Sequence, residues 1–289
     1  MKAAPFTYHA PSTVAETLGL LTTLDNPRLL AGGQSLMPML AYRLATPDHL
    51  IDLGGLTDLR EITMRDGWMA VGSMVTQRRL ELAPEVKRHS PLLVEALAHV
   101  GHQTTRNRGT IGGSLCHLDP SAELPLVSLV LDPMLSVAGR RGVRTLPYRE
   151  FPVTQLVNQL EPDEILTEVA FPPLPPGTSC AFQEFARRPG DFAIVAVALC
   201  ITRAADDKVD SARLAVAGIG PVAVRLPEVE HFLVEEGWGA AQIERAAALA
   251  ATQPADGDAG NPADYRQHLV GVLTRRALQA VDAKVPRDA

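Results

Sequence analysis

The sequence predicts an α+β fold in which a small α/β unit and a mixed α/β unit precede a C-terminal α+β unit. Residues 28–31 and 50–53 are short apolar runs that each stop at a glycine pair, as buried strands that enter tight turns do. Residues 165–171 alternate apolar and polar side chains and stop at a proline pair. After residue 177, strand patterns come first and alanine-rich helical patterns follow, an order typical of α+β units.

The first unit is predicted to cover residues 1–55. Thr13 and Glu16 have the spacing of a helix capping box, so a helix should run from about Thr13 to Leu24. The two apolar runs described above supply the strands that follow this helix. Together these elements make a small α/β unit.

The second unit is predicted to cover residues 56–173. Residues 68–72 favour a strand, and a helix should begin at Pro91, because Ser90 is typical of an N-cap and proline of the first helical position. A further helix is predicted behind Asp119, which is either its N-cap or a ligand-binding side chain. The alternating run at 165–171 closes the unit.

The third unit is predicted to cover residues 178–289, after a linker at 174–177 that contains two prolines and a glycine. It should hold a three-stranded sheet and several helices. The predicted strands lie near 181–186, 192–202 and 212–218. Two helices are predicted to begin near 229 and 240, and a last helix is predicted to cover 262–283.

Composition limits the function classes. The formal charge is −6 and the pI is about 5.8, which argues against a nucleic-acid-binding surface. The N-terminus lacks the apolar core of a signal peptide, and no apolar run is long enough to span a bilayer. We therefore expect a cytoplasmic protein with neither nucleic acid nor membrane as a partner.

The cysteine and histidine pattern predicts no metal site. Cys116, Cys180 and Cys200 are an odd number at wide spacings, which favours reduced thiols over a disulfide framework. The chain has no C-x-x-C pair, so an iron–sulfur cluster or structural zinc would have to lie in another chain. His99 and His102 near this region match no familiar ligand spacing.

Two diglycine segments are the strongest indication of function. Gly32-Gly33-Gln34-Ser35 follows a predicted strand, and Thr110-Ile111-Gly112-Gly113-Ser114 repeats the pattern. Without large side chains, backbone N–H groups can approach and point at a pyrophosphate. A single diglycine is better explained as a simple strand-to-helix turn and is weak evidence for a ligand site. Two of them, without a Rossmann or phosphate-loop motif, favour a dinucleotide contacted by two separate loops, at about 31–38 and 110–120.

Polar residues behind the second diglycine are candidates for the rest of the ligand. His117, Asp119 and Glu123 are placed to contact ribose hydroxyls or a ring edge. Glu123 is alternatively a first-turn acid that complements the helix dipole. The run 106–108 contains two arginines, which either offset phosphate charge or belong to a solvated loop.

The segments Ala31-Gly32-Gly33-Gln34-Ser35-Leu36-Met37-Pro38 and Arg106-Asn107-Arg108-Gly109-Thr110-Ile111-Gly112-Gly113-Ser114 strongly resemble one family. It is the FAD-binding medium subunit of molybdenum hydroxylases, the group of carbon monoxide dehydrogenase, xanthine dehydrogenase and bacterial N-heterocycle hydroxylases. The resemblance covers essentially the whole chain and includes 187–192. It implies a two-subdomain FAD-binding domain of the PCMH type, followed by a C-terminal α+β domain.

The resemblance also implies which residues contact one non-covalent FAD. No catalytic residue and no metal ligand is expected in this chain. The implied cofactor contacts are Leu29, Leu30, Ala31, Gly32, Gly33, Gln34, Ser35, Leu36, Val100, Thr110, Ile111, Gly112, Gly113, Ser114, His117, Asp119, Glu123, Leu166 and Phe192.

In the family, such a subunit performs no substrate hydroxylation. The resemblance implies a large partner subunit with the molybdenum cofactor and a small partner subunit with two [2Fe–2S] clusters. It also allows that two such heterotrimers form a dimer. The FAD of this chain would pass electrons to an acceptor such as oxygen, a quinone, a cytochrome or NAD. The substrate at the partner's molybdenum site is expected to be an N-heterocycle or an aldehyde.

Two alternatives stay open from the residues themselves. The chain could be a self-sufficient FAD-dependent oxidase or reductase, with His117 as a proton donor or with FAD attached covalently through His117 or Cys116. It could also be an interaction protein whose glycine loops hold no ligand. A yellow preparation excludes the second alternative, and flavin that stays attached after denaturation would indicate covalent linkage.

Overall fold

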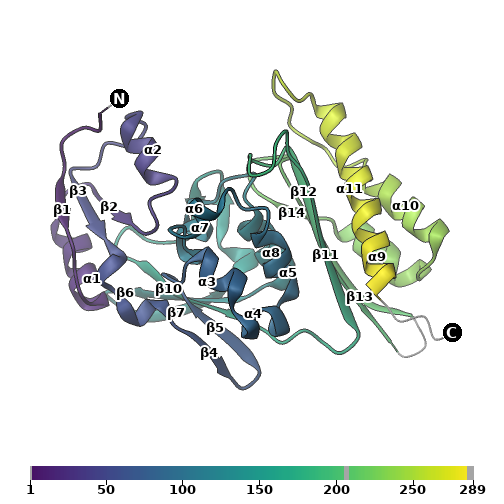
Figure 1. Cartoon of the computed structure of the whole chain (residues 1–289), viewed down its shortest axis with the longest axis horizontal. Helices are drawn as coiled ribbons and strands as arrows, with labels where there is room; N and C mark the ends of the chain where they lie inside the picture. Colours follow the sequence, from purple (N-terminus) through teal and green to yellow (C-terminus); the bar gives the residue numbers. More distant parts are fainter. Residues whose placement is uncertain (1, 205–207, 285–289) are drawn as a thin grey trace.

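The structure is a computed structural model that describes residues 2–204 and 208–284. Three main sheets, each with its own helices, follow one another along the described chain, and Figure 1 shows them side by side from the N-terminus to the C-terminus. Both helices and strands are abundant, so the predicted α+β class is confirmed.

The N-terminal sheet is parallel, with the strand order β1-β3-β2. Its first helix is α1, whose N-cap Thr13 accepts a hydrogen bond from the backbone of Glu16, as the sequence predicts. Both predicted strands lie one residue nearer the N-terminus than expected. The elements are β1 (Thr7–His9), α1 (Val14–Thr23), β2 (Pro27–Leu30), α2 (Leu36–Ala41) and β3 (His49–Asp52).

The middle sheet is antiparallel, with the order β4-β5-β10-β6-β7. The predicted strands at 68–72 and 165–171 and the helix start at Pro91 are confirmed. The strands are β4 (Ile62–Arg65), β5 (Trp68–Gly72), β6 (Met134–Gly139), β7 (Gly142–Pro147) and β10 (Ile165–Phe171), with a hairpin of β8 (Pro152–Thr154) and β9 (Val157–Asn158). The helices are α3 (Gln77–Leu82), α4 (Pro84–His89), α5 (Pro91–Leu97), α6 (Gln103–Arg106), α7 (Ile111–His117) and α8 (Glu123–Leu131).

The C-terminal sheet is antiparallel, with the order β11-β12-β13-β14. The three long strands match the three predicted ones, and the two-residue β14 adds a fourth that the sequence did not predict. The elements are β11 (Thr178–Phe185), β12 (Val195–Arg203), β13 (Val209–Ala217), β14 (Val224–Arg225), α9 (Pro227–Glu236), α10 (Ala240–Ala250) and α11 (Ala263–Lys284).

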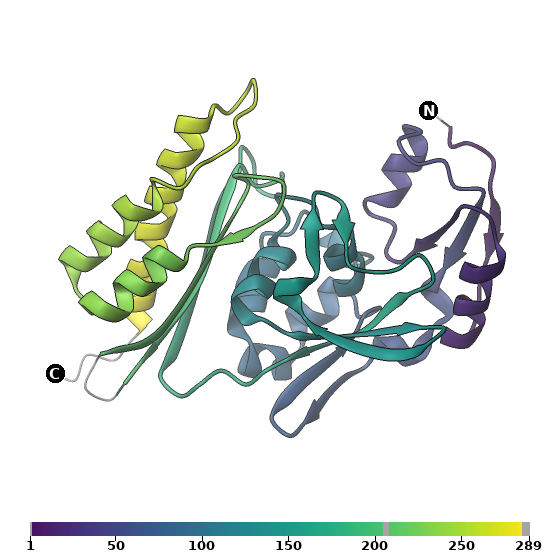
Figure 2. The ribbon, with the colours of Figure 1, turned by 180° about the vertical axis from the view of Figure 1, so that it is seen from behind.

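Both faces of the C-terminal sheet are covered. Strand β12 is buried along its whole length, and seven of its nine residues are apolar. One face packs against α9, α10 and α11, and the other packs against α5 and α8 of the middle region. Figure 2 shows the same arrangement from behind. One hydrophobic core therefore joins the middle region to the C-terminal sheet.

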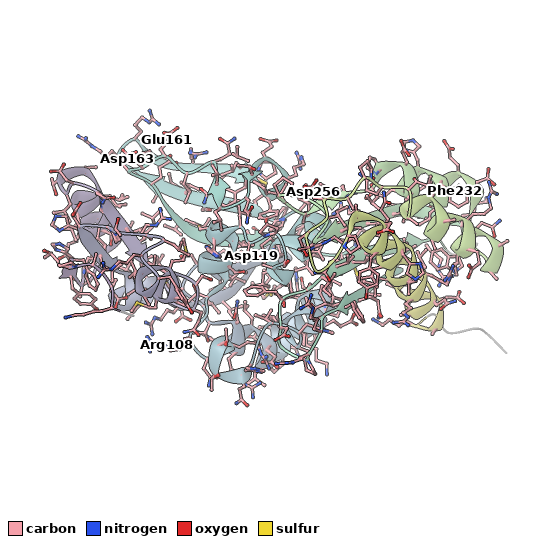
Figure 3. All side chains as sticks on the ribbon, turned by 90° about the horizontal axis from the view of Figure 1, so that it is seen from above. Arg108, Asp119, Glu161, Asp163, Phe232 and Asp256 are labelled. Atoms are coloured by element: carbon pink, nitrogen blue, oxygen red, sulfur yellow. A yellow bond between two sulfur atoms is a disulfide. The ribbon has the colours of Figure 1, made fainter. Side chains whose placement is uncertain are left out.

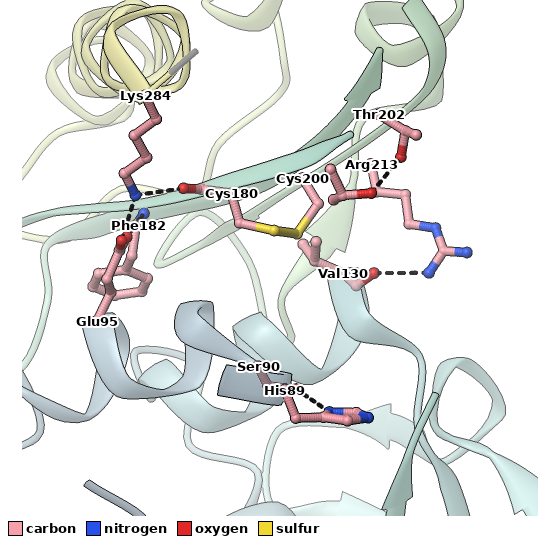
Figure 4. The surroundings of a disulfide bond; sticks show 11 residues. His89, Ser90, Glu95, Val130, Cys180, Phe182, Cys200, Thr202, Arg213 and Lys284 are labelled. Carbon is pink, nitrogen blue, oxygen red and sulfur yellow. Dashed lines mark hydrogen bonds and ion pairs between the residues drawn. A yellow bond between two sulfur atoms is a disulfide. The ribbon is translucent and has the colours of Figure 1, made fainter. Parts of the chain in front are cut away.

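The expectation of three reduced cysteines is wrong for two of them. Cys180 and Cys200 lie directly opposite each other on β11 and β12 and form a disulfide, while Cys116 is free. Wide spacing in the sequence did not reveal that two adjacent antiparallel strands place them together. Figure 4 shows the disulfide beside Lys284. The ammonium group of Lys284 donates a hydrogen bond to the carbonyl oxygen of Cys180 and forms an ion pair with Glu95 of α5.

Within the described ranges, none of the helices combines the length and the hydropathy that a membrane crossing requires.

Candidate functional site

The first diglycine forms a turn at the carboxyl end of β2. Parallel strands β2 and β3 carry their carboxyl ends at the same edge of the sheet, where ligands of open parallel sheets bind. Gly33 has a φ of +74°, a conformation that glycine adopts without strain. The turn leads directly into α2, whose N-cap Ser35 makes no side-chain capping bond.

This turn presents free hydrogen-bond donors. Among the described residues, no partner is found for the backbone N–H groups of Gly32, Gly33, Gln34 and Ser35. Backbone N–H groups need partners, and consecutive ones that point outward form an anion-binding concavity. The turn therefore has the donor set that a pyrophosphate requires.

The second diglycine differs from the sequence prediction. Residues 111–117 form helix α7 instead of a loop, with Thr110 as the N-cap. The N–H groups of Ile111, Gly112 and Gly113 already donate within the chain, to Val75 O, Ser73 O and Thr110 Oγ1. A short helix forms because the Thr110 hydroxyl caps it, despite the low helix propensity of glycine.

The two diglycine segments meet in space. A Cβ on Gly32 would lie 2.2 Å from the carbonyl oxygen of Arg108 and 2.7 Å from Cα of Gly109. A Cβ on Gly113 would lie 3.3 Å from Cβ of Ala31. In Figure 3, Arg108 lies at the side of the middle region that faces the N-terminal unit. The glycines therefore allow close contact between two protein segments, beside the free N–H groups of the first.

Arg106 is not available to offset phosphate charge. Its guanidinium is buried and donates to both carboxylate oxygens of Glu81, at 2.9 and 3.2 Å, and to the carbonyl oxygens of Val100 and Gly101. The hypothesis of a phosphate-binding arginine therefore fails for Arg106. Its observed contacts fix the segment that carries Val100, while Arg108 is exposed.

Asp119 does not cap the next helix. Helix α8 begins at Glu123 with Ala122 as its N-cap, and Asp119 accepts a hydrogen bond from the backbone of Ser121 at 2.9 Å. The N-cap interpretation of Asp119 is therefore wrong, because the chain makes a turn before the helix starts. Asp119 lies near the centre of the molecule in Figure 3.

Glu123 is a buried acid at the start of α8. Only 8% of the residue is exposed, and burial raises the pKa of its carboxyl group to about 8. A hydrogen bond from the backbone N–H of Glu123 lowers this pKa, while the negative charges of the nearby Glu184 and Asp119 raise it further. At neutral pH the carboxyl group is therefore mainly protonated and able to donate a hydrogen bond.

His117 and Cys116 do not form a reactive pair. Burial lowers the pKa of His117; the charge of Asp119 opposes this shift, and the charge of Arg28 adds to it. Burial raises the pKa of the Cys116 thiol to about 12, so little thiolate is present at neutral pH. The Coulombic effect of Arg28 also indicates that His117 of α7 lies near the strand β2 that precedes the first turn.

The other predicted contacts lie around this region. Leu166 of β10 is buried in the same hydrophobic cluster as Ile111 of α7. Phe192 is 73% exposed in the loop between β11 and β12. A Cβ on Gly190 in that loop would lie 2.8 Å from the ring of His102, which places the loop beside the segment that follows Val100.

One polar residue of this region was missed by sequence reasoning. The side chain of Glu184 is only 4% exposed, and it lies near Glu123. Burial raises its pKa to about 7. The available signal was the alternation of Cys180, Phe182 and Glu184 on β11, which places the acid on the face that packs against α5 and α8.

These features fit FAD. The N–H groups of 32–35 suit its pyrophosphate, and the close approach at Gly32 requires glycine. The buried oxygen Oε2 of Glu184 has no hydrogen-bond partner among the described residues, and a buried polar atom needs one.

Comparisons with known proteins agree with this fit. The family described as "FAD binding domain in molybdopterin dehydrogenase" matches residues 4–174, and the "CO dehydrogenase flavoprotein C-terminal domain" matches residues 180–281.

Relatives match over nearly the whole chain. The "6-hydroxypseudooxynicotine dehydrogenase complex subunit alpha" of Paenarthrobacter nicotinovorans is 37% identical and aligns over 96% of this chain and 95% of its own. The "Nicotine 6-hydroxylase medium subunit" of the same organism is 35% identical over 98% and 100%. A solved carbon monoxide dehydrogenase of Hydrogenophaga pseudoflava, which lacks the Mo-pyranopterin moiety of its molybdenum cofactor, superimposes with a TM-score of 0.94 at 33% identity, covering 99% and 100%.

Proposed function

This chain belongs to the family of FAD-binding medium subunits of molybdenum hydroxylases, and on that premise we propose that it carries electrons from [2Fe–2S] clusters of a partner subunit to an external acceptor. It is thus an oxidoreductase subunit whose cofactor is FAD. The large partner would hold the molybdenum cofactor and oxidise the substrate. The observation that carries the proposal is the run of free N–H groups at 32–35, held against the second diglycine segment.

The proposed contacts divide between the two ends of α7. Residues 29–36 would supply the N–H donors for the pyrophosphate, and residues 110–114, whose own N–H groups donate within the chain, would contribute close backbone approach. Val100, His117, Asp119, Glu123, Leu166 and Phe192 would surround the remaining parts of FAD. Helix α7 has seven residues and so spans about 10 Å between these two groups.

FAD, when bound, would accept electrons from the [2Fe–2S] clusters of the partner subunit and release them to an external acceptor. The residues of this chain bind and orient it. The seam between α5, α8 and the C-terminal sheet excludes water, because its side chains form one apolar cluster. The neutral acid Glu123 holds a proton at the edge of this cluster at neutral pH.

For the substrate of the assembly we propose a small N-heterocycle. The support is that two relatives, at 37% and 35% identity over nearly the whole chain, are named for nicotine or a nicotine derivative, and nicotine contains a pyridine ring. Aldehydes are the second candidate class.

The test uses the tagged, natively expressed chain together with whatever it binds. We expect a yellow preparation with flavin absorbance, molybdenum and iron, and one larger and one smaller polypeptide. The flavin should be released by denaturation, since no covalent bond is proposed. Reduction of the bound flavin after addition of the larger polypeptide's substrate, in the absence of an external acceptor, serves as the functional readout.

The variant Gly32→Val should abolish flavin absorbance but retain both partner polypeptides. The new side chain would clash with the carbonyl oxygen of Arg108 and so distort the turn that is proposed to bind the pyrophosphate. Gly19→Val, in a helix where a Cβ would meet nothing within 4 Å, is the matched control. A metal-free yellow chain that oxidises a substrate alone would instead establish a self-sufficient flavoenzyme. A colourless chain that binds no added FAD would overturn the proposal.

A further inference from the structure

Glu184 is an acid on a strand face that is otherwise apolar. It follows Cys180 and Phe182 at two-residue spacing on β11, and both of these pack in the cluster shared with α5 and α8. Alternation along a strand places Glu184 on the same face. Its side chain is 4% exposed, so a carboxyl group lies at the seam between the middle region and the C-terminal sheet.

One oxygen of this carboxyl group lacks a hydrogen-bond partner among the residues that the structure describes. Among the described residues, Oε2 of Glu184 is buried and makes no hydrogen bond. Oε1 lies 3.9 Å from Nδ1 of His99, which is beyond hydrogen-bond distance. An unpaired buried carboxylate would be strongly unfavourable, so the environment favours the protonated acid or a ligand that satisfies it.

Other acids lie near Glu184, whose own pKa is raised by burial. Glu123 at the start of α8 lies close enough to interact with Glu184, and Asp119 adds negative charge beside Glu123. Arg106, a positive group that acts on Glu123, donates to both oxygens of Glu81. Burial lowers the pKa of His99, against the opposing effect of Glu95, so this ring is mainly uncharged at neutral pH.

The position of Glu184 is central to the predicted flavin contacts. Its neighbour His99 directly precedes Val100, and Glu123 is a predicted contact on α8. The loop that carries Phe192 leaves the end of β11 only one residue after Glu184 and returns past His102 at Gly190. Three segments that carry predicted contacts therefore lie beside this acid or begin next to it.

We propose that Glu184 is a flavin-binding residue, which donates a hydrogen bond as a protonated carboxylic acid to an acceptor atom of the flavin ring. This inference rests on the proposed function and adds a contact to its site. The flavin ring carries carbonyl oxygens and ring nitrogens that accept hydrogen bonds, and a carboxylate cannot donate to them. Protonation of Glu184 would then be coupled to FAD affinity.

The sign of this coupling follows from the chemistry. Burial raises the pKa of Glu184 to about 7, so the acid donates below that pH and loses its proton above it. If FAD binds only the protonated form, its dissociation constant should rise about tenfold for each pH unit above that pKa.

The test measures FAD release from the tagged assembly by dialysis against FAD-free buffer, followed by flavin absorbance, at several values between about pH 6 and about pH 9. For the wild type we expect at least about tenfold weaker binding at the alkaline end. Glu184→Gln, which keeps a neutral donor, should bind FAD with little pH dependence. Glu184→Ala should bind weakly at every pH.

Controls separate this role from a structural one. Glu228→Gln makes the same chemical change at an exposed site on α9 and should titrate like the wild type. If Glu123→Gln removes the pH dependence while Glu184→Gln keeps it, the proton belongs to Glu123 and the inference is overturned. A wild type whose affinity is constant over this range also overturns it, without any variant. A wild type that never binds FAD overturns the proposed function as well.

Discussion

At the scale of single residues, glycine at position 32 allows a close backbone contact that any side chain would prevent. A Cβ on Gly32 would overlap the carbonyl oxygen of Arg108. We expect Gly32→Ala to lower the free energy of unfolding by about 1–3 kcal/mol and to abolish FAD retention. Urea unfolding and flavin absorbance measure the two effects.

The control for this change is Gly19→Ala in α1, where a Cβ meets nothing within 4 Å. There, alanine should stabilise the protein by about 0.5–1 kcal/mol, because it restricts the unfolded chain. If both variants kept their flavin equally, the close approach at Gly32 would have no role in binding.

The buried acid Glu123 should make stability fall with rising pH. Its pKa rises from 4.5 in the unfolded chain to about 8 in the native protein. Between these values the native state keeps a proton that the unfolded state releases, so unfolding becomes easier by about 1.4 kcal/mol per pH unit at most. In FAD-free protein, Glu123→Gln should reduce this slope between about pH 5 and about pH 8. Equal slopes in urea titrations would contradict the assignment.

Residue identity alone predicted part of the site. Glycine pairs are predictable because their freedom and small size are properties of the residue. Glu184 was not predictable in this way, because an acid in a strand is usually solvent-exposed, and only the packing of β11 on α5 buries it. Arg106 failed for the same reason, since its partner Glu81 lies on α3, distant in the sequence.

At the scale of elements, capping residues correctly predicted helix starts, and the alternation of apolar and polar residues correctly predicted a strand. Thr13, Pro91 and the run 165–171 mark elements that the structure confirms. Short helices such as α3, α4 and α6 were not predicted, because six or fewer residues carry too little periodicity. Helix α7 was predicted as a loop, since the glycine pair outweighs its Thr110 cap in the sequence.

Thr110 should connect the stability of α7 with cofactor binding. Its hydroxyl accepts from the N–H of Gly113 at 3.0 Å, so Thr110→Ala should cost about 1 kcal/mol of unfolding free energy. Thr13→Ala removes an equivalent cap from α1 and should cost a similar amount. Only Thr110→Ala should release FAD. Loss of flavin from both variants would point to general destabilisation instead.

The disulfide between β11 and β12 should stabilise the C-terminal sheet. Cys180 and Cys200 are 20 residues apart, and a crosslink over this distance contributes about 3 kcal/mol. We expect reductant, or Cys180→Ser with Cys200→Ser, to lower the free energy of unfolding by up to this amount. Cys116→Ser is the matched control. Detection of three free thiols in unreduced, denatured protein would contradict the bond.

At the scale of the whole molecule, the three predicted units follow the order of the sheets, but their cores are not separate. Cluster residues of the C-terminal sheet, such as Phe182 and Ala198, pack with Leu92 of α5 and Leu124 of α8. Another cluster joins Leu21 of the first unit to β10. Sequence patterns gave the order of the units but not this sharing, because it depends on contacts between distant segments. The boundaries at 55, 173 and 178 stay predictions.

Because of the shared core, the middle and C-terminal regions should unfold together. We expect one calorimetric transition for both, and an isolated segment of residues 178–289 should be insoluble, since it exposes the face that packs on α5 and α8. Two resolved transitions with a soluble C-terminal fragment would contradict this. The N-terminal unit has a smaller cluster and is the part that could melt separately.

The shared core also sets rules for recombining this chain with a relative. A chimera joined at the linker would combine two independently selected sets of side chains in one interior, although the backbone junction itself would be harmless. A replacement that transfers α5 and α8 together with the C-terminal sheet would keep matched surfaces in contact. The unit of exchange is therefore defined by the packed layers and is discontinuous in the gene.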